Sequence, residues 1–343
     1  MSSEQATSTP LVKLSKRDFD PGIDVRWCPG CGDYSILANV QRALPAMGVP
    51  REKIVFISGI GCSSRFPYYM NTFGFHTIHG RAPAFATGLK AHRPDLDVWM
   101  VTGDGDGLSI GGNHLIHILR RNLNVNILLF NNRIYGLTKG QYSPTSEVGK
   151  VTTSSPVGSI DAPFRPLSLA LGAEATFVAR VIDTDAKMMQ EVLMAAHAHQ
   201  GTSLIEIYQN CNVFNDGAFA DITNKEDKLD RQLALKAGEP MRFGKDGSKA
   251  IIMKNERLTV ATVGEDGVSE DDVLVHDPAN PDPSMAFWLT RFEHPEFPVP
   301  VGVFRSVERP CYDESFARQI DEASSEKTEL RDLLYGGDTW TVE

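Results

Sequence analysis

The sequence predicts an α/β protein built on a parallel sheet with helices on both faces, followed by an extended C-terminal arm. Short runs of Val, Ile and Leu alternate with segments in which apolar residues recur every three or four positions, the pattern of strands and amphipathic helices. The strand-like runs are apolar throughout, as in parallel strands buried on both faces. Beyond about residue 220 the chain becomes charged and then rich in Pro and Asp, which indicates an arm or subdomain.

The expected elements follow this pattern in order. Residues 34–48 form a helix, since Ile36, Val40 and Leu44 fall on one face. Further helices are expected at 84–92, 113–122 and 185–200, strands at 53–59, 97–103, 125–132 and 203–211, and a loop at 68–83. Three regions result, namely a polar leader at 1–21, a main domain at 22–220 and the C-terminal arm or subdomain at 221–343.

Length and charge bound the class of protein. The chain has 343 residues, enough to bury a core without metal ions or disulfides. Its formal charge of −10 argues against nucleic acid as the main partner. No apolar run approaches the roughly 20 residues of a membrane-spanning helix, and the N-terminal residues lack a signal-peptide pattern. We therefore expect a cytoplasmic protein, in which clustered thiols bind metal or take part in catalysis more often than they form disulfides.

Unusual polar residues follow the ends of several expected strands. Cys62, Asp104, the pair Asn131–Asn132 and Cys211 each lie just past such an end. In an open parallel sheet, the carboxyl ends of the strands line the crevice that binds ligands. The sequence therefore places one candidate site at that edge.

Two of these strand ends carry a motif suited to a diphosphate and a divalent cation. Asp104 in GDGDG offers a carboxylate, Asn132 an amide oxygen and Ile134 a backbone carbonyl, which are ligands that Mg²⁺ accepts beside phosphate. The glycines allow backbone N–H groups to approach the diphosphate. GDG followed after one helix by NN resembles the thiamine diphosphate binding motif. The alternatives are a tight turn of Asp and Gly and a nicotinamide fingerprint, which the misplaced third Gly and the NN pair disfavour.

Four of the five cysteines suit an iron–sulfur cluster. Cys28 and Cys31 form a C-x₂-C pair, and Cys62 and Cys211 follow strands. Four thiolates are the usual set for a [4Fe–4S] cluster, which could take the single electrons released when a 2-oxoacid is decarboxylated on thiamine diphosphate. Structural Zn²⁺ is the alternative, although zinc ribbons usually show two close pairs. Cys311 lacks a motif and is interpreted as a buried free cysteine.

Five long motifs then give the chain a resemblance to a known family. They are WCPGCGDYSIL at 27–37, SGIGCSSRFPYY at 58–69, HTIHGRAPAFATGLK at 76–90, GDGDGLSIGGNHLIHILRRN at 103–122 and NNRIYGLTKGQYSPTS at 131–146. The chain resembles the β subunits of 2-oxoacid:ferredoxin oxidoreductases, and within them the 2-oxoglutarate type. The resemblance implies a thiamine-diphosphate-binding fold that holds thiamine diphosphate, Mg²⁺ and one [4Fe–4S] cluster.

The resemblance also implies an activity and partners. The reaction would be oxidative decarboxylation of 2-oxoglutarate with coenzyme A to succinyl-CoA and CO₂, with electrons passing through the cluster to ferredoxin. An α subunit, often fused to a γ-type domain, would supply the other half of the cofactor site, including the carboxylate that activates the aminopyrimidine. The assembly would be a dimer of αβ pairs, without nucleic acid or membrane, and the chain alone would be inactive.

Carried onto this sequence, the resemblance assigns roles residue by residue. The cluster ligands are Cys28, Cys31, Cys62 and Cys211, and the Mg²⁺ ligands are Asp104, Asn132 and the Ile134 carbonyl. The diphosphate loop comprises Gly103, Gly105, Asp106, Gly136, Leu137 and Thr138. The residues expected near the thiazolium and pyrimidine rings are Ile60, Cys62, Ser63 and His79.

Arg65, His79 and Lys139 are the expected catalytic residues. Arg65 lies shortly after a cluster cysteine, and Lys139 occupies a position where the resemblance implies Gly in pyruvate-type enzymes. Two cations suit the distal carboxylate of 2-oxoglutarate, but they would equally suit coenzyme A phosphates, α-subunit carboxylates or solvent. Competing hypotheses are the same chemistry on pyruvate or another 2-oxoacid, a non-redox thiamine enzyme with structural zinc, and a regulatory iron–sulfur scaffold with a vestigial thiamine site.

Overall fold

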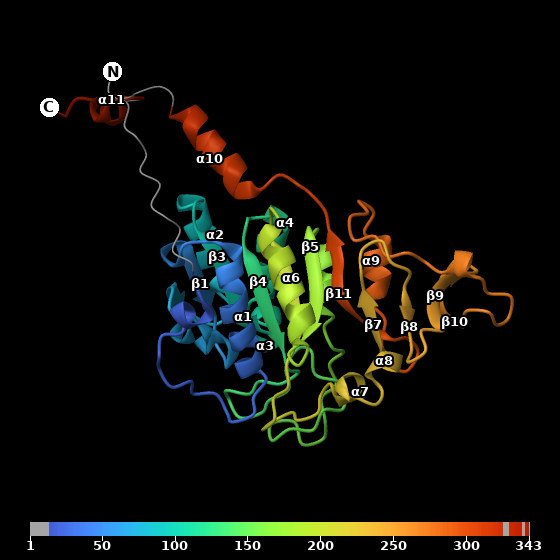
Figure 1. The fold of residues 1–343 in the computed structure, drawn as a ribbon. Helices are drawn as coiled ribbons and strands as arrows, with labels where there is room; N and C mark the ends of the chain where they lie inside the picture. The colour runs from blue at the N-terminus through green and yellow to red at the C-terminus, as the bar shows by residue number, and fades with distance from the viewer. Residues whose placement is uncertain (1–13, 325–328, 338–339, 343) are drawn as a thin grey trace.

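An eight-stranded sheet forms the centre of the computed structural model, which describes residues 14–324, 329–337 and 340–342. The strand order is β2-β1-β3-β4-β6-β5-β11-β7 (Figure 1). The first six strands are parallel, and their bounds are β1 Ile54–Ser58, β2 Phe73–His76, β3 Asp97–Gly103, β4 Asn126–Asn131, β5 Phe177–Ile182 and β6 Ser203–Tyr208. Their carboxyl ends meet at one edge of the sheet, so the residues that follow them are brought together.

Helices cover both faces of this sheet. Successive strand residues point to opposite faces, so in β1 Val55 and Ile57 join one core cluster while Ile54 and Phe56 join the other. The first cluster packs against α2 Ala82–His92, α4 Gly112–Arg121, α5 Pro166–Gly172 and α9 Ser284–Leu289, and the second against α1 Asp33–Met47 and α6 Ala186–Ala198. The predicted α/β fold with helices on both faces is confirmed.

The C-terminal region is partly woven into the main sheet. β11 Val299–Ser306 pairs antiparallel with β5, and β7 Gln232–Leu235 pairs parallel with β11. A separate antiparallel sheet comprises β8 Arg242–Phe243, β9 Lys249–Lys254 and β10 Arg257–Thr262. Between these regions lie the short helices α7 Ala220–Thr223 and α8 Lys228–Arg231. The extended arm is α10 Tyr312–Ala323 and α11 Leu330–Tyr335, which project from the body in Figure 1.

Some local expectations differ from the structure. The loop expected at 68–83 contains β2, an exposed edge strand whose residues FGFH lack the continuous apolar pattern of a buried strand. The GDGDG stretch forms the short helix α3 Asp104–Leu108 instead of a turn. The described end of the polar leader forms a 3₁₀ helix, Lys16–Phe19, and Phe19 is buried in the core, while residues 1–13 lie outside the described part of the chain.

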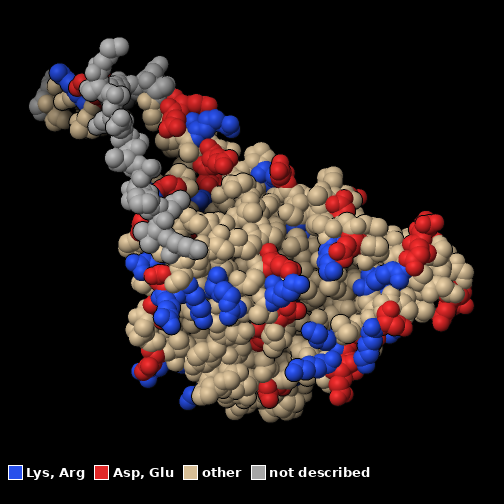
Figure 2. All heavy atoms as spheres, in the orientation of Figure 1, with Lys and Arg blue, Asp and Glu red and all other residues tan. Residues whose placement is uncertain are grey.

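The surface and helix lengths add two observations. Figure 2 shows acidic and basic side chains interspersed over much of this face, with a largely uncharged area at its lower end, where Figure 1 places the loops that follow the parallel strands. Among the described residues, no helix combines the length and apolar character needed to cross a bilayer.

Candidate functional site

A cavity of about 570 Å³ lies at the carboxyl edge of the parallel strands. Its volume is within the range of small-molecule and cofactor sites, about 300–1,000 Å³. All the residues predicted to contact the cofactor line it, namely Ile60, Cys62, Ser63, His79, Gly103, Asp104, Gly105, Asp106, Asn132, Ile134, Gly136, Leu137 and Thr138. Three strand ends, those of β1, β3 and β4, thus converge on one hollow.

Asp104 is held in place by hydroxyl groups from a distant loop. It is the first residue of α3 and is buried. Ser143 Oγ donates to Asp104 Oδ2 at 2.5 Å, and Thr145 Oγ1 donates to the same oxygen at 2.6 Å. Burial raises the pKa of the Asp104 carboxyl to about 6. A cation bound nearby favours the ionised form, so this carboxylate suits a metal ligand.

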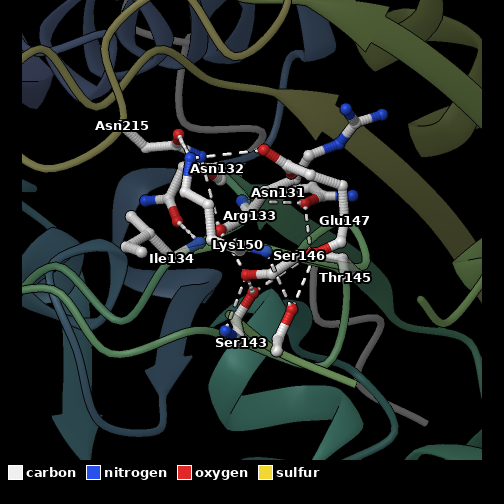
Figure 3. A network of polar contacts seen from close by, with 11 residues as sticks. Asn131, Asn132, Arg133, Ile134, Ser143, Thr145, Ser146, Glu147, Lys150 and Asn215 are labelled. Atoms are coloured by element: carbon white, nitrogen blue, oxygen red, sulfur yellow. Dashed lines mark hydrogen bonds and ion pairs between the residues drawn. The ribbon is translucent and has the colours of Figure 1, made fainter. Parts of the chain in front are cut away.

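The two asparagines of the NN pair face different ways. Asn132 lines the cavity, and its Oδ1 accepts the Ile134 N–H at 3.2 Å. Arg133, between them, has a left-handed φ of 56°, which turns the chain so that residues 132 and 134 both reach the cavity. Asn131 instead donates through Nδ2 to Glu206 Oε1 at 2.8 Å. Figure 3 shows this strand end enclosed by the 143–150 loop and Asn215.

Asp106 braces the loops around the cavity. Its Oδ1 accepts the backbone N–H groups of Ile60 at 3.0 Å and Gly80 at 2.7 Å and contacts His79 Nδ1 at 2.7 Å, while Thr102 Oγ1 donates to Oδ2 at 2.7 Å. Because both carboxylate oxygens are occupied, Asp106 acts through the loops it holds. It fixes the His79 ring through Nδ1, which leaves Nε2 to face a ligand.

Two glycines lie where a side chain would not fit or would crowd the site. A Cβ on Gly105 would lie 2.2 Å from Tyr135 Cε1, and the Tyr135 hydroxyl donates to the Gly105 carbonyl at 2.9 Å. A Cβ on Gly136 would lie 3.6 Å from the sulfurs of both Cys62 and Cys211. Gly136 therefore separates the cavity from two of the predicted cluster ligands by very little.

The loop carrying the C-x₂-C pair is fastened to the loops carrying the other two cysteines. Cys31 N–H donates to the Cys28 carbonyl at 3.0 Å, which closes the turn between them. Trp27 Nε1 donates to the Cys62 carbonyl at 2.7 Å, and Asn212 Nδ2 donates to the Pro29 carbonyl at 2.6 Å. The structure thus brings Cys28, Cys31, Cys62 and Cys211 to one corner.

The thiols in this corner influence one another. Burial, then the charges of Asp33, Cys211 and Cys28, raises the pKa of the Cys62 thiol to about 12. The pKa of Cys31 is likewise raised, first by burial and then by Asp33, Cys211 and Cys62. In the described chain, no three His, Cys, Asp or Glu side chains converge closely enough to hold a single metal ion. All five cysteines are free, and Cys311 is buried at the start of α10, beside a different hollow.

The two predicted substrate cations lie off the cavity wall. Arg65 Nε donates to the Tyr69 hydroxyl at 2.9 Å, and its charge lowers the pKa of Cys62 slightly against the effect of burial. Lys139 is exposed, with a left-handed φ of 77°, in the turn whose neighbours Leu137 and Thr138 line the cavity. Lys139 therefore lies at the rim, and Arg65 lies beside the thiols.

Sequence reasoning missed several residues that complete the site. Asp33, Gly61, Phe130, Tyr135 and Gln141 also line the cavity. Asp33 is buried, its Oδ2 has no hydrogen-bond partner, and burial followed by the charge of Asp183 raises its pKa to about 7. Asp33 directly follows CPGCG, and Tyr135 lies in the quoted NNRIYG motif, so their positions were available as signals. Long-range partners such as Ser143 were not.

Comparisons with known proteins agree with this geometry. Residues 59–207 match the model of the family described as thiamine pyrophosphate enzyme, C-terminal TPP binding domain. The chain is 56% identical over 332 residues to 2-oxoglutarate oxidoreductase subunit KorB of Mycobacterium tuberculosis, covering 95% of this chain and 88% of that protein. It is 46% identical over 190 residues to 2-oxoacid:ferredoxin oxidoreductase 1, subunit beta, of Aeropyrum pernix, covering 55% of this chain and 60% of that protein.

A solved structure extends the match to the fold. The chain superposes with a TM-score of 0.74 and 33% identity on a chain of a 2-oxoglutarate:ferredoxin oxidoreductase from Magnetococcus marinus with 2-oxoglutarate, coenzyme A and succinyl-CoA bound, covering 95% of this chain and 96% of that one. Since the match to the Mycobacterium protein spans nearly both chains, this chain belongs to the β-subunit family of 2-oxoacid:ferredoxin oxidoreductases, of the 2-oxoglutarate type.

Proposed function

We propose that the chain is the β subunit of an enzyme that converts 2-oxoglutarate, coenzyme A and two oxidised ferredoxins into succinyl-CoA, CO₂ and two reduced ferredoxins. One observation carries this proposal. The cavity suited to a diphosphate cofactor and the four-cysteine corner share a wall at Gly136, whose Cβ position is 3.6 Å from two thiol sulfurs. A decarboxylating centre and an electron acceptor placed this close make single-electron transfer between them feasible.

The cavity residues fit thiamine diphosphate and Mg²⁺. Asp104, Asn132 and the Ile134 carbonyl provide oxygen ligands for the cation, and the buried Asp104 carboxyl lacks a neighbouring cation to balance it. Thiamine diphosphate supplies a carbanion-stabilising centre for 2-oxoacid decarboxylation. The Asp106–His79 contact orients the imidazole, so His79 can donate or accept a proton through Nε2 at the cavity mouth.

The four-cysteine corner fits a [4Fe–4S] cluster better than zinc. Around one zinc ion four thiolates converge at bond distances of about 2.3 Å, and the described side chains contain no such convergence. A cubane cluster binds each thiolate through a different iron atom, so its ligands lie further apart. The mutual electrostatic influence of Cys28, Cys31, Cys62 and Cys211 fits that looser grouping.

Substrate recognition is assigned to the rim of the cavity. Lys139 is exposed there and offers a cation to the distal carboxylate of 2-oxoglutarate. The Magnetococcus marinus relative was solved with 2-oxoglutarate, coenzyme A and succinyl-CoA bound, which supports the same substrates here. Arg65, which lies beside Cys62, is proposed to act on the cluster corner instead of on the substrate.

An α subunit is proposed to cover the open cavity, and ferredoxin to take the electrons, in a cytoplasmic dimer of αβ pairs. The names of the relatives as β subunits support an α partner. Large apolar side chains are exposed at the cavity mouth, with Leu137 at 51% and Ile78 at 69% exposure, and such patches commonly mark protein interfaces.

The test is an assay of the anaerobic α–β complex with 2-oxoglutarate, pyruvate, coenzyme A and a one-electron dye. We expect dye reduction that depends on coenzyme A and is fastest with 2-oxoglutarate. Asp104→Ala should abolish thiamine diphosphate binding and leave the iron content unchanged, whereas Asp95→Ala, at an exposed surface ion pair, serves as the control and should do neither. Equal rates with pyruvate would overturn the assigned substrate, and loss of iron with retained cofactor would overturn the assigned map.

A further inference from the structure

Gln209 lies between the two halves of the site. It directly follows β6 and precedes Cys211 by two positions. Its side chain is buried, with 1% of the residue exposed, and its backbone N–H donates to the Asn131 carbonyl at 3.0 Å. The backbone of Gln209 is therefore fixed to the strand that carries the NN pair.

The Gln209 side chain contacts one residue from each half. Its Oε1 accepts from Asn132 Nδ2 at 2.8 Å, and its Nε2 donates to Cys31 Sγ at 3.2 Å and to the Asn210 carbonyl at 2.6 Å. One amide thus joins a proposed Mg²⁺ ligand to a proposed cluster ligand.

The orientation of this amide follows from its partners. Both hydrogens of Nε2 are used, one on the sulfur and one on the Asn210 carbonyl. Reversing the amide would set its oxygen against that carbonyl and its NH₂ against the Asn132 NH₂ group. The same bond commits the nitrogen of Asn132, so its oxygen Oδ1 is the atom left for the cavity side.

We propose that Gln209 is a positioning residue that couples the Mg²⁺–thiamine diphosphate site to the iron–sulfur cluster. It holds the Asn132 oxygen toward the cation, and its N–H group hydrogen-bonds the Cys31 sulfur. Hydrogen bonds to cluster sulfurs stabilise the more negative, reduced state and raise the reduction potential. The inference rests on the proposed function, because it requires both groups to be bound.

Two variants separate the two contacts in the anaerobic α–β complex. Gln209→Met keeps the approximate shape and removes both hydrogen bonds. Gln209→Glu keeps an oxygen acceptor for Asn132 and removes the N–H donor to Cys31. Gln41→Met is the matched control, because Gln41 is also a buried amide that donates to a backbone carbonyl, that of Tyr69 at 3.1 Å. For each protein, the cluster midpoint potential is measured by an EPR-monitored redox titration and Mg²⁺–thiamine diphosphate affinity by fluorescence quenching.

We expect Gln209→Met to change both readings. Loss of the N–H donor should disfavour cluster reduction about tenfold, which for one electron is a shift of about 59 mV to lower potential. Loss of the Asn132 contact should weaken cofactor affinity about tenfold, the typical effect of removing a partner of a metal ligand. Gln209→Glu should lower the potential at least as far and bind the cofactor with near wild-type affinity, and Gln41→Met should change neither.

The outcomes discriminate clearly. A Gln209→Met cluster that forms and titrates at the wild-type potential overturns the inference, as does an equal shift in Gln41→Met. If Gln209→Met does not retain its cluster, Gln209→Glu carries the test of potential. In the wild type, loading the cofactor should shift the cluster potential, and a potential that is the same with and without it also overturns the coupling. Wild-type protein without iron would instead refute the proposed function.

Discussion

The contact between Gly105 and Tyr135 predicts a large effect for a single methyl group. In Gly105→Ala the new Cβ would lie 2.2 Å from Tyr135 Cε1 and 2.6 Å from Cζ, whereas carbon atoms pack at about 3.5–4.0 Å. Tyr135 must therefore move, and its hydroxyl would lose the 2.9 Å hydrogen bond to the Gly105 carbonyl.

The magnitude follows from three contributions to the free energy of unfolding. Overpacking costs about 1–3 kcal/mol, and the lost hydrogen bond costs about 1 kcal/mol. Replacing Gly by Ala within a helix returns about 1 kcal/mol. The net expectation is a loss of about 2 kcal/mol. Because Tyr135 lines the cavity, its displacement should also weaken thiamine diphosphate binding.

Urea unfolding of the anaerobic β chain measures the loss, with Gly112→Ala as the matched control. Gly112 begins α4 and a Cβ there meets nothing within 4 Å, so this variant should be neutral or slightly more stable. In a Tyr135→Ala background, Gly105→Ala should no longer destabilise, which a double-mutant cycle quantifies. Wild-type stability of Gly105→Ala, or additive effects of the two changes, would refute the reasoning.

Three other predictions concern separate parts of the chain. Ser143→Ala and Thr145→Val each release the Asp104 carboxylate from a hydroxyl donor, so Mg²⁺ affinity measured by titration should fall about tenfold. His199 is buried and burial lowers its pKa to about 4 from 6.5, so protonation of the unfolded chain alone should remove up to about 3 kcal/mol of stability as pH falls from 6.5 to 4, a loss that urea unfolding of His199→Gln should not show. Lys139→Gly should relieve the left-handed backbone and stabilise the fold by about 1 kcal/mol, while raising KM for 2-oxoglutarate more than for pyruvate.

Each of these has a result that contradicts it. Unchanged Mg²⁺ affinity in both hydroxyl variants would mean that Asp104 needs no such support, and Ser154→Ala, in an exposed loop, provides the comparison. A His199→Gln protein with the same acid sensitivity as wild type would place the responsible proton elsewhere. If Lys139→Gly stabilises the fold and affects both substrates equally, Lys139 has a backbone role only.

The sheet and the cavity were predictable because their signals are local. Continuous apolar runs mark the buried strands, and the polar residues directly after β1, β3, β4 and β6 must meet at one edge once those strands are parallel. For that reason, Cys62, Asp104 and Asn132 could be grouped before any coordinates.

Features that depend on tertiary contacts were not predictable. β2 has exposed residues and no buried-strand pattern, and β7 and β11 join the main sheet from a region whose composition indicates an arm. The partners of Asp104 lie some forty residues away in sequence, at Ser143 and Thr145. Gln209 carries no motif, and its place between Asn132 and Cys31 exists only after three loops have packed together.

The most direct test is the metal content and spectrum of the anaerobically purified chain. Four cysteine sulfurs around a [4Fe–4S] cluster predict about four iron and four sulfide per chain, and an EPR signal from the reduced cluster that appears when 2-oxoglutarate and coenzyme A are added to the α–β complex. Cys211→Ser should lose that signal and keep thiamine diphosphate. A colourless chain with one zinc ion, or a cluster that the substrate never reduces, would contradict the joining of the two centres at this edge of the sheet.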